Sequence, residues 1–580
     1  MRSSTTLMRA GSLLALAALA AGSASAQTKP LPIKYSGPPT VAAITAGDLM
    51  TRLYIYADDS LMGRRVGTDY NLKATAYIES QVRKMGLKPA GDDGYFQSIG
   101  MVSRSLDSTS STLTVDGKAY KAGVDFLGNT NGVMHPVAAA PVVVWGSVFD
   151  TTGNPTPEQY AGKWVLVRPA TGAPAGFDQA TFIKSAGYQR FLAMQSSTSV
   201  AGRLSINAAD TFSTIQVRNA TNSTGSLLSV KETRPVAVTV TKKVAEDIFG
   251  PTAMTAAPGT MGKSIAADIR FTDVARGGRN VIAVLPGSDP KLKGQYIVVG
   301  AHNDHIGFNN RPVDHDSMKV FLKTVQKQGA DARPTPPTPE QWAAINAEIA
   351  ELRKLNPPRP DSISNGADDD GSGSVTLLEI AEAYAKGAGK PKRSMLFIWQ
   401  TGEESGMLGS GYFMDHPTVP RDSIVADFNI DMVGRGAPTD VTGVQKEGGF
   451  LAGADRYVQL VGSRRLSTEL GNLVEDVNKS PKYNFKLDYA MDANGHPQNI
   501  YCRSDHWSYG KWGVPAVFFT TGGHADYHQV TDEPQYIRYD HMALLANLIF
   551  DSTLRAASLD HRVLVDGVKP NPAPATACQQ

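Results

Sequence analysis

The sequence predicts an α/β fold, a mostly parallel sheet sandwiched by helices, with an inserted β-rich module. From Asn280 onward, short apolar runs alternate with helical ones, which favours a parallel sheet covered by helices on both faces. Between residues 103 and 275 the composition shifts to Thr, Ser, Val and Gly, with short apolar runs bounded by turn residues. That texture indicates a separate β-rich domain inside the α/β one.

The elements of the α/β domain follow from hydrophobic spacing. From Thr45 to Gly86, apolar residues recur at helical spacing with a polar break at residues 58–65, which predicts two amphipathic helices. A further helix is predicted over residues 375–385. Apolar runs bounded by turn residues predict strands at 281–285, 296–301, 395–399, 424–430 and 516–519.

Composition excludes several classes of protein. With 41% hydrophobic positions, 19% charged positions and two Cys in 580 residues, the chain is neither disordered, nor a disulfide-stapled miniprotein, nor a thiolate zinc finger. Removing the first 26 residues takes away Arg2 and Arg9, so that Lys and Arg fall from 57 to 55, equal to the 55 Asp and Glu. Without a basic excess, we expect no nucleic-acid partner.

The first 26 residues are typical of a signal peptide. Arg2 and Arg9 precede a short apolar run, and small residues at 24–26 predict cleavage before Gln27. The apolar run is shorter than the roughly 20 residues that a membrane span needs, so we expect no stable membrane insertion. The mature protein is therefore expected to be exported, either to a periplasm or out of the cell. Export permits a disulfide between Cys502 and Cys578, but the sequence leaves that pairing open.

One segment interrupts the α/β alternation. Residues 309–363 carry Pro-rich flanks around a single helix, for which Thr338 is the expected N-cap, Pro339 the first residue and Gln341 the partner in a capping box. The segment is either a surface helix or a lid over the cleft, and its position between two proposed metal-binding segments favours the lid.

Polar side chains follow the predicted strands. The motif GAHNDH places His302 and Asp304 at the end of the strand at 296–301. A second HxD triplet begins at His524, but ligands of open α/β sheets gather at the carboxyl ends of strands, which favours His302. The motif GADDDGSGS puts Asp369 at the centre of three adjacent carboxylates, which are costly to bury without a cation. The alternative is a solvated loop with an Asp N-cap.

Three further acids and one histidine follow later strands. In QTGEESG, neighbouring Glu403 and Glu404 point opposite ways if extended, so that one can bind metal while the other faces a reacting water. Asp431 ends the strand at 424–430, and His528 follows the strand at 516–519. The candidate metal ligands are His302, Asp369, Glu404, Asp431 and His528. Two imidazoles and three carboxylates suit borderline and hard divalent cations. If Asp369 bridges two zinc ions, three carboxylates and one hydroxide balance four positive charges.

These motifs resemble a known family. The series GAHNDH, GADDDGSG, QTGEESGMLGSGYF, NIDMVGR, RSDHWSYGKWGVPAVFF and DYHQVTDE is similar, in order and spacing, to the zinc-dependent exopeptidases that include secreted bacterial leucyl aminopeptidases, glutamate carboxypeptidases and glutaminyl cyclases (metallopeptidase family twenty-eight). The segment from residue 61 to 97 looks like that family's amino-terminal helices. The departures are the insert after GAHNDH and Asn303, where an aromatic residue is common.

The resemblance implies a role for each residue. Asp369 would bridge both metals, with His302 and Asp431 completing one and Glu404 and His528 the other. Asp304 would fix the tautomer of His302, and Glu403 would be the general base. The module at 103–275 looks like a protease-associated domain, most clearly in YAGKWVLVRP, residues 160–169.

The resemblance also implies a domain plan and a function. The expected domains are 1–26 signal peptide, 27–102 amino-terminal part of the catalytic domain, 103–275 inserted module, 276–556 main catalytic part with the insert at 309–363, and 557–580 tail. The expected function is a secreted aminopeptidase with two Zn²⁺ per chain, acting on peptides with a free N-terminus. A carboxypeptidase, a glutaminyl cyclase and a non-catalytic receptor-like relative are the alternatives. Side-chain preference and oligomeric state stay open.

Overall fold

The computed structural model describes residues 31–580 apart from short gaps. The gaps are 130–134, 151, 171, 173–176, 178–180, 183–184, 222, 228–234, 333–335, 571–577 and 579. The predicted signal peptide and Pro334 of the insert lie outside the described residues.

A large mixed sheet, sheet A, forms the centre of the catalytic domain. Its order is β21 (Lys486–Asp488), β20 (Tyr457–Val461), β22 (Ala516–Thr520), β17 (Ile424–Ile430), β13 (Tyr296–His302), β16 (Ser394–Gln400), β12 (Phe271–Leu285), β2 (Phe96–Leu106) and β9 (Ser223–Leu227), with β1 (Lys88–Pro89) also paired to β12. The neighbours β22, β17, β13 and β16 run parallel. β12 and β2 extend the sheet antiparallel. The predicted α/β class with a mostly parallel central sheet is confirmed.

Helices cover both faces of sheet A. Alternate residues of each strand point to opposite faces, so each face has an apolar surface that helices can bury. Ile297 and Val299 of β13 belong to the larger core, whereas Val298 packs into a second core on the other face. The larger core is covered by α1 (Ala46–Tyr56), α2 (Asp69–Met85), α10 (Gly373–Ala385), α12 (Thr468–Asn478) and α14 (Tyr539–Ser558). The opposite core lies under α11 (Leu408–Asp415) and α13 (His506–Gly510).

The two amino-terminal helices lie where the hydrophobic spacing predicts them. Thr45 caps α1 by accepting a hydrogen bond from the backbone N–H of Asp48, and Thr68 caps α2 in the same way. The polar break between them forms the short helix η1 (Asp59–Arg64). α2 ends at Gly86, whose φ of 78° is the left-handed conformation that glycine adopts without strain.

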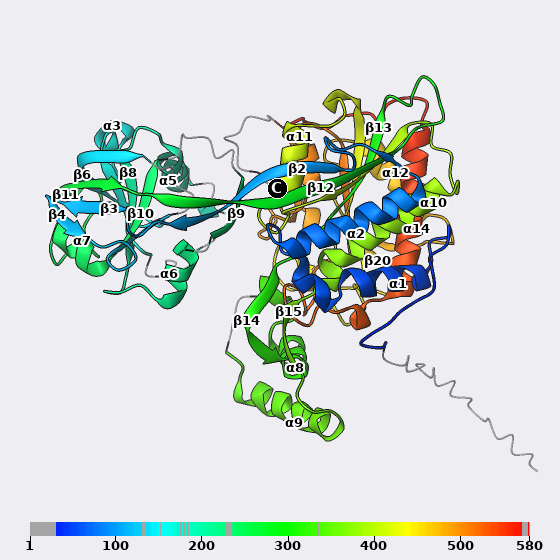
Figure 1. Ribbon diagram of the computed structural model, residues 1–580, viewed down its shortest axis with the longest axis horizontal. Helices are drawn as coiled ribbons and strands as arrows, with labels where there is room; N and C mark the ends of the chain where they lie inside the picture. The colour runs from blue at the N-terminus through cyan, green and yellow to red at the C-terminus, as the bar shows by residue number, and fades with distance from the viewer. Residues whose placement is uncertain are drawn as a thin grey trace, which may run out of the picture.

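The inserted module forms a second sheet with its own core. Sheet B has the order β4 (Lys118–Tyr120), β3 (Thr112–Val115), β11 (Met261–Asp268), β6 (Pro136–Gly146), β7 (Trp164–Val167), β8 (Gly202–Asn207), β10 (Val236–Thr241) and β5 (Phe126–Gly128). Its helices are α3 (Pro157–Tyr160), α5 (Ala186–Ser196), α6 (Thr214–Thr221) and α7 (Lys242–Phe249). The long antiparallel strands β2 and β12 run from sheet A to this module (Figure 1). The predicted boundaries at 102/103 and 275/276 fall inside those two strands.

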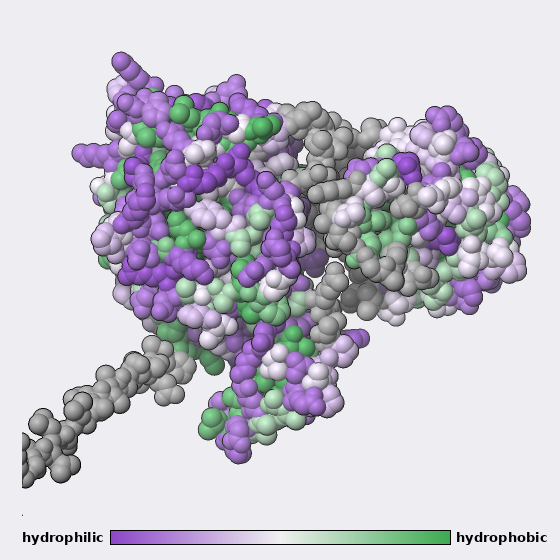
Figure 2. Space-filling model, turned by 180° about the vertical axis from the view of Figure 1, so that it is seen from behind, coloured by the Kyte–Doolittle hydropathy of each residue, from purple (hydrophilic) through white to green (hydrophobic). Residues whose placement is uncertain are grey.

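The insert is an arm on the catalytic domain. β14 (Gly307–Asp314) pairs with β15 (Pro360–Ser364), and between them lie α8 (His315–Val325), η2 (Gly329–Asp331) and α9 (Pro339–Leu355). α9 carries the expected capping box, in which Thr338 and Gln341 hydrogen-bond each other's backbone N–H groups. Seen from in front and from behind, α8 and α9 project from the rest of the domain (Figures 1 and 2).

The remaining short elements complete the catalytic domain. They are η3 (Ala367–Ser372), η4 (Arg421–Ser423), β18 (Val441–Val444), β19 (Phe450–Ala452), η5 (Ala490–Asp492), η6 (Ile500–Cys502) and η7 (Pro534–Tyr536). Cys502 and Cys578 form a disulfide with their Cα atoms 5.7 Å apart, which ties the tail to η6. Across the described residues, none of the helices combines the length and apolarity that crossing a bilayer requires.

Candidate active site

The sequence-predicted ligands meet at one edge of sheet A. Because the four central strands are parallel, their carboxyl ends lie side by side. His302 is the last residue of β13, Asp431 follows β17, and Glu404 follows β16. His528 reaches the same place from the loop after β22. All five predicted ligands, including Asp369, are brought together.

The Asp triplet is buried. Asp368, Asp369 and Asp370 are 0%, 3% and 0% exposed in η3, directly before α10, so the alternative of a solvated loop is wrong. The flanking carboxylates accept hydrogen bonds from backbone amides in place of water: Asp370 from His302 N–H at 3.1 Å and Asp368 from Gly434 N–H at 2.7 Å. Asp369 differs, because its carboxylate faces other side chains instead of the backbone.

The two oxygens of Asp369 face two different groups of side chains. Oδ1 lies 3.1 Å from Nε2 of His302, which is itself 3.5 Å from Oδ1 of Asp431. Oδ2 lies 3.0 Å from Nε2 of His528, which is 2.9 Å from Oε2 of Glu404. One carboxylate therefore stands between two clusters of potential metal ligands.

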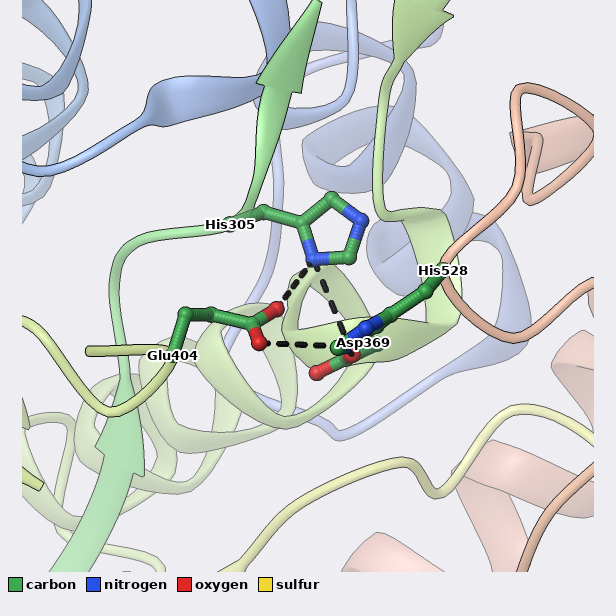
Figure 3. Close-up of side chains that lie close together, drawn as sticks. All are labelled: His305, Asp369, Glu404 and His528. Atoms are coloured by element: carbon green, nitrogen blue, oxygen red, sulfur yellow. Dashed lines mark ion pairs between the residues drawn. The ribbon is translucent and has the colours of Figure 1, made fainter. Parts of the chain in front are cut away.

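The second cluster contains a histidine that the sequence patterns did not reveal. Nδ1 of His305 lies 2.7 Å from Oε1 of Glu404 and 3.6 Å from Oδ2 of Asp369 (Figure 3). His305 is fully buried, and its ring meets that of His528 edge-on. Its place in GAHNDH, three residues after His302, was the available signal. The turn that follows β13 decides where its side chain points, and a strand pattern does not predict that turn.

The chemistry of both groups fits metal ions. Ligand atoms of His302, Asp369 and Asp431 lie within 4.8 Å of one another, and so do those of His305, Asp369, Glu404 and His528. Several of these atoms are buried with no hydrogen-bond partner within the chain: His302 Nε2, His305 Nδ1, Glu404 Oε1, Asp431 Oδ1 and His528 Nε2. Buried polar atoms are rarely left unpaired in native proteins. Two divalent cations would satisfy them all.

The pKa values of the site also indicate that the cluster favours positive charge. Burial lowers the pKa of His528, but Asp369 and Glu404 outweigh it and raise that pKa to about 11. Burial would raise the pKa of Asp369, yet the neighbouring imidazoles of His302 and His528 hold it well below its usual value. The cluster therefore attracts positive charge strongly, whether as a proton or as a metal ion.

Glu403 and Asp304 lie beside the cluster. Glu403 lines the adjoining pocket together with Asp369 and Asp431, and burial raises the pKa of its carboxyl group well above the ordinary value. The carboxylate of Asp304 lies 3.7 Å from Nδ1 of His302, beyond hydrogen-bond range. That nitrogen hydrogen-bonds the backbone oxygen of Asp304 instead, at 3.1 Å. Oδ1 of Asp304 instead accepts from the N–H groups of Gly402 and Glu403, at 2.7 and 3.1 Å.

A pocket opens onto the cluster from the solvent side. Its apolar wall includes Met432, Met491, Ile500 and Phe518. Gln328 and Asp331 of the insert also line it. The insert thus contributes to the pocket through the segment between α8 and α9. Lys319 of α8 also pairs with Asp526, in the loop after β22.

Two arginines near the pocket are already paired with acids. Arg435 donates to Asp526 at 2.7 Å in a buried pair. Arg503 binds both carboxylate oxygens of Asp331, each at 3.0 Å. The second HxD triplet lies behind the cluster, where Nε2 of His524 is 3.1 Å from Asp368.

Paired imidazoles and carboxylates at the carboxyl edge of such a sheet form a candidate centre for two metal ions. Comparison with known proteins identifies this part of the chain: residues 280–553 match the model of peptidase family M28. Leucine aminopeptidase 1 of Aspergillus fumigatus is 30% identical over 194 residues, 32% of this chain and 44% of that protein. The chain thus spans less than half the length of this curated relative.

Solved structures resemble this one at low sequence identity. The aminopeptidase from Aneurinibacillus sp. strain AM-1 is 16% identical, with a TM-score of 0.45, and the match covers 91% of this chain and 97% of that one. BSAP, a zinc aminopeptidase from Bacillus subtilis, is 15% identical, with a TM-score of 0.44 and coverage of 89% and 96%.

Proposed function

We propose that the protein is an exported aminopeptidase that uses two zinc ions to release the amino-terminal residue of peptides. The observation that carries this proposal is the position of Asp369, whose two oxygens face His302 and His528 separately. A carboxylate in that position can bridge two ions, as a two-metal hydrolase needs.

Each cluster then has a role. His302 and Asp431 would hold one ion, Glu404 and His528 the other, and Asp369 both. His305 would join the second ion, since its Nδ1 faces Glu404 and Asp369. When bound, the zinc pair would lower the pKa of water and polarise the scissile carbonyl.

Glu403 is the proposed general base. It would take a proton from the water that attacks the carbonyl carbon and deliver it to the amine nitrogen as the C–N bond breaks. Its place in the lining of the pocket beside Asp369 and Asp431 suits a group that must reach this water. Asp304 would position Glu403, because it binds the backbone N–H groups of Gly402 and Glu403.

The arginines favour an amino-terminal substrate. A carboxypeptidase needs a cation for the terminal carboxylate, but Arg435 and Arg503 are each engaged by an Asp side chain. The acidic residues beside the pocket would instead attract an ammonium group. The apolar wall, with Met432, Met491 and Phe518, suits an apolar first side chain.

Matched peptides test the polarity. Acetylation of the amino terminus should slow hydrolysis by more than about 10²-fold, because the polar groups of the site lose their partner, while amidation of the carboxyl terminus should have little effect. The opposite pattern would indicate a carboxypeptidase. Release of pyroglutamate from an amino-terminal glutamine peptide would indicate a cyclase, and failure to process any peptide in metal-loaded protein would indicate a receptor-like relative.

Export is proposed from the first 26 residues alone. The charged start, the short apolar run and the small residues at 24–26 support cleavage before Gln27. Amino-terminal sequencing of protein recovered from the periplasm or the medium tests it, and a mature chain that begins at Met1 would refute it.

A further inference from the structure

A second cavity lies where the insert joins the catalytic domain. It has a volume of about 210 Å³, room for several water molecules, each of which occupies about 30 Å³ in the liquid. Asp59 of η1, Asp361 of β15, Asn365 and Glu533 are among its lining residues. None of these belongs to the strand-end cluster.

Three potential metal ligands converge at this junction. His315 begins α8, Asp361 lies in β15, and Glu533 directly precedes η7. One ligand atom of each lies within 4.8 Å of the others, and Nδ1 of His315 is 2.9 Å from Oδ2 of Asp361. His315 is fully buried and Glu533 is 8% exposed. The group therefore differs from an ordinary acidic surface patch.

An unpaired oxygen in the same cavity is the second, independent observation. The side-chain nitrogen of Asn365 donates to Oδ1 of Asp59 at 2.8 Å and to Oε1 of Glu533 at 3.0 Å. These two bonds fix the orientation of the amide, since a flipped amide would place its oxygen against two carboxylates. Oδ1 of Asn365 then has no partner, although the residue is only 2% exposed. A buried acceptor of this kind calls for a donor or a cation.

The local charge also calls for a cation. Four carboxylates line the cavity, from Asp58, Asp59, Asp361 and Glu533, whereas the cations are Lys34 and Arg359. The like charges of these carboxylates repel one another in this partly enclosed space. A divalent ion would remove this repulsion.

We propose that His315, Asp361 and Glu533 form a third divalent-metal site, separate from the strand-end cluster and beside the cavity that Asn365 lines. The mixed nitrogen and oxygen ligands suit zinc and similar transition metals better than calcium. The hydroxyl of Tyr536, 3.3 Å from Nε2 of His315, can accept the Nε2 proton and leave Nδ1 free to bind. The ion would cross-link α8 and β15 of the insert to the loop before η7.

The chain contains a matched control. His561 also lies between two carboxylates, but Glu469 is 2.6 Å from its Nε2 while Asp560 is 2.8 Å from its Nδ1. Ligands on opposite ring nitrogens cannot converge on one ion. The His561 side chain is also about half exposed, so His561→Gln should leave the zinc count unchanged.

Zinc counting on the full-length protein tests the site. Metal is stripped with a chelator, the protein is dialysed against ZnCl₂, and bound zinc is measured by elemental analysis. Wild type should bind one zinc more than His315→Gln or Glu533→Gln, while Asp361→Asn should weaken that ion at least tenfold. Added zinc should also raise the melting temperature of wild type more than that of His315→Gln.

The outcomes separate this site from the proposed zinc pair. In Asp369→Asn, which removes the proposed bridging ligand, the third ion should persist and disappear only on adding His315→Gln. If circular dichroism shows that His315→Gln is unfolded, the milder Asp361→Asn decides. Equal zinc counts and affinities in folded wild type and Asp361→Asn would overturn the third site, whatever the count at the strand ends.

Discussion

Sheet A and sheet B have similar strand arrangements, but the residues that follow their parallel strands differ. Both are mixed sheets with adjacent parallel strands, and each has a buried apolar core. The parallel strands of sheet A are followed by buried acids and imidazoles, such as His302 and Asp431. In the described part of the module, no three His, Asp or Glu side chains place ligand atoms close enough to hold an ion.

This difference between the two sheets indicates that the candidate metal ligands come from residues at or just past the strand ends, and not from the apolar strands themselves. The strands β6 and β7 also have buried apolar residues, with Val144, Val165 and Leu166 fully buried. Sequence changes at the strand ends of sheet A should therefore affect catalysis far more than changes in the module.

Asp369→Asn should have the largest effect. An amide cannot neutralise two cations as a bridging carboxylate can, so both strand-end zinc ions should be lost together with activity. Chelation of wild type should give the same loss, reversed by zinc or cobalt. Elemental analysis is the measurement, and a variant that keeps both ions and its turnover would contradict the bridging role.

The neighbouring Glu pair should show two different phenotypes. Glu403→Gln should lower kcat by at least about 10²-fold, the usual contribution of a general base, while both zinc ions stay bound. Glu404→Gln should instead lose zinc, because its carboxylate faces His305 and His528. Zinc content and kcat measured together distinguish the two. Exchanged phenotypes would mean that the roles are reversed.

His305→Gln should have a smaller effect. The remaining ligands Asp369, Glu404 and His528 would still hold the ion, but we expect about tenfold weaker zinc binding. Competition with a zinc-binding dye gives the affinity. Unchanged affinity would make His305 a hydrogen-bond partner of Glu404 and nothing more.

Shortening the insert should change selectivity more than rate. Replacing residues 309–362 with a short Gly/Ser linker joins Phe308 to Ile363, whose Cα atoms are paired in β14 and β15. Dipeptide turnover should stay within a few fold, and cleavage of longer peptides should improve, because the segment with Gln328 and Asp331 no longer narrows the pocket. The same length preference before and after would refute the lid.

Removing the module should have the least effect. Ser105 and Thr272 are paired across β2 and β12, so an Asn-Gly turn between them would close a hairpin in place of residues 106–271. Dipeptide turnover and zinc content of a folded variant should stay within a few fold of wild type. A large loss of either would mean that the module supports the site.

Much of this organisation can be predicted from the sequence. Apolar runs predict the central strands, and the polar residue after each run predicts which side chains gather at the sheet edge. The location of His302 and Asp431 depends on that regular pattern, whereas His528 reaches the edge through the loop after β22. The sequence also suggests that Glu403 and Glu404 diverge, and in the structure one lines the pocket while the other faces the histidines.

The features that the sequence does not predict depend on irregular backbone and distant partners. The path after β13 decides that His305 turns inward and that the backbone of Asp304, not its carboxylate, meets His302. Local periodicity carries no information on either. Likewise, His315 and Glu533 are far apart in the chain, and they come together because the insert docks on η7.

The spread of the site along the chain determines when it can assemble. Its side chains extend from His302 to His528, and His528 lies in the loop after β22, which pairs with β17. A nascent or truncated chain that stops before β22 lacks a complete metal centre. Folding of the carboxyl-terminal segment and metal uptake are therefore linked equilibria, and bound zinc favours the completed fold. The metal centre would then be complete only once this carboxyl-terminal segment has been made and metal is present in the compartment where the chain folds.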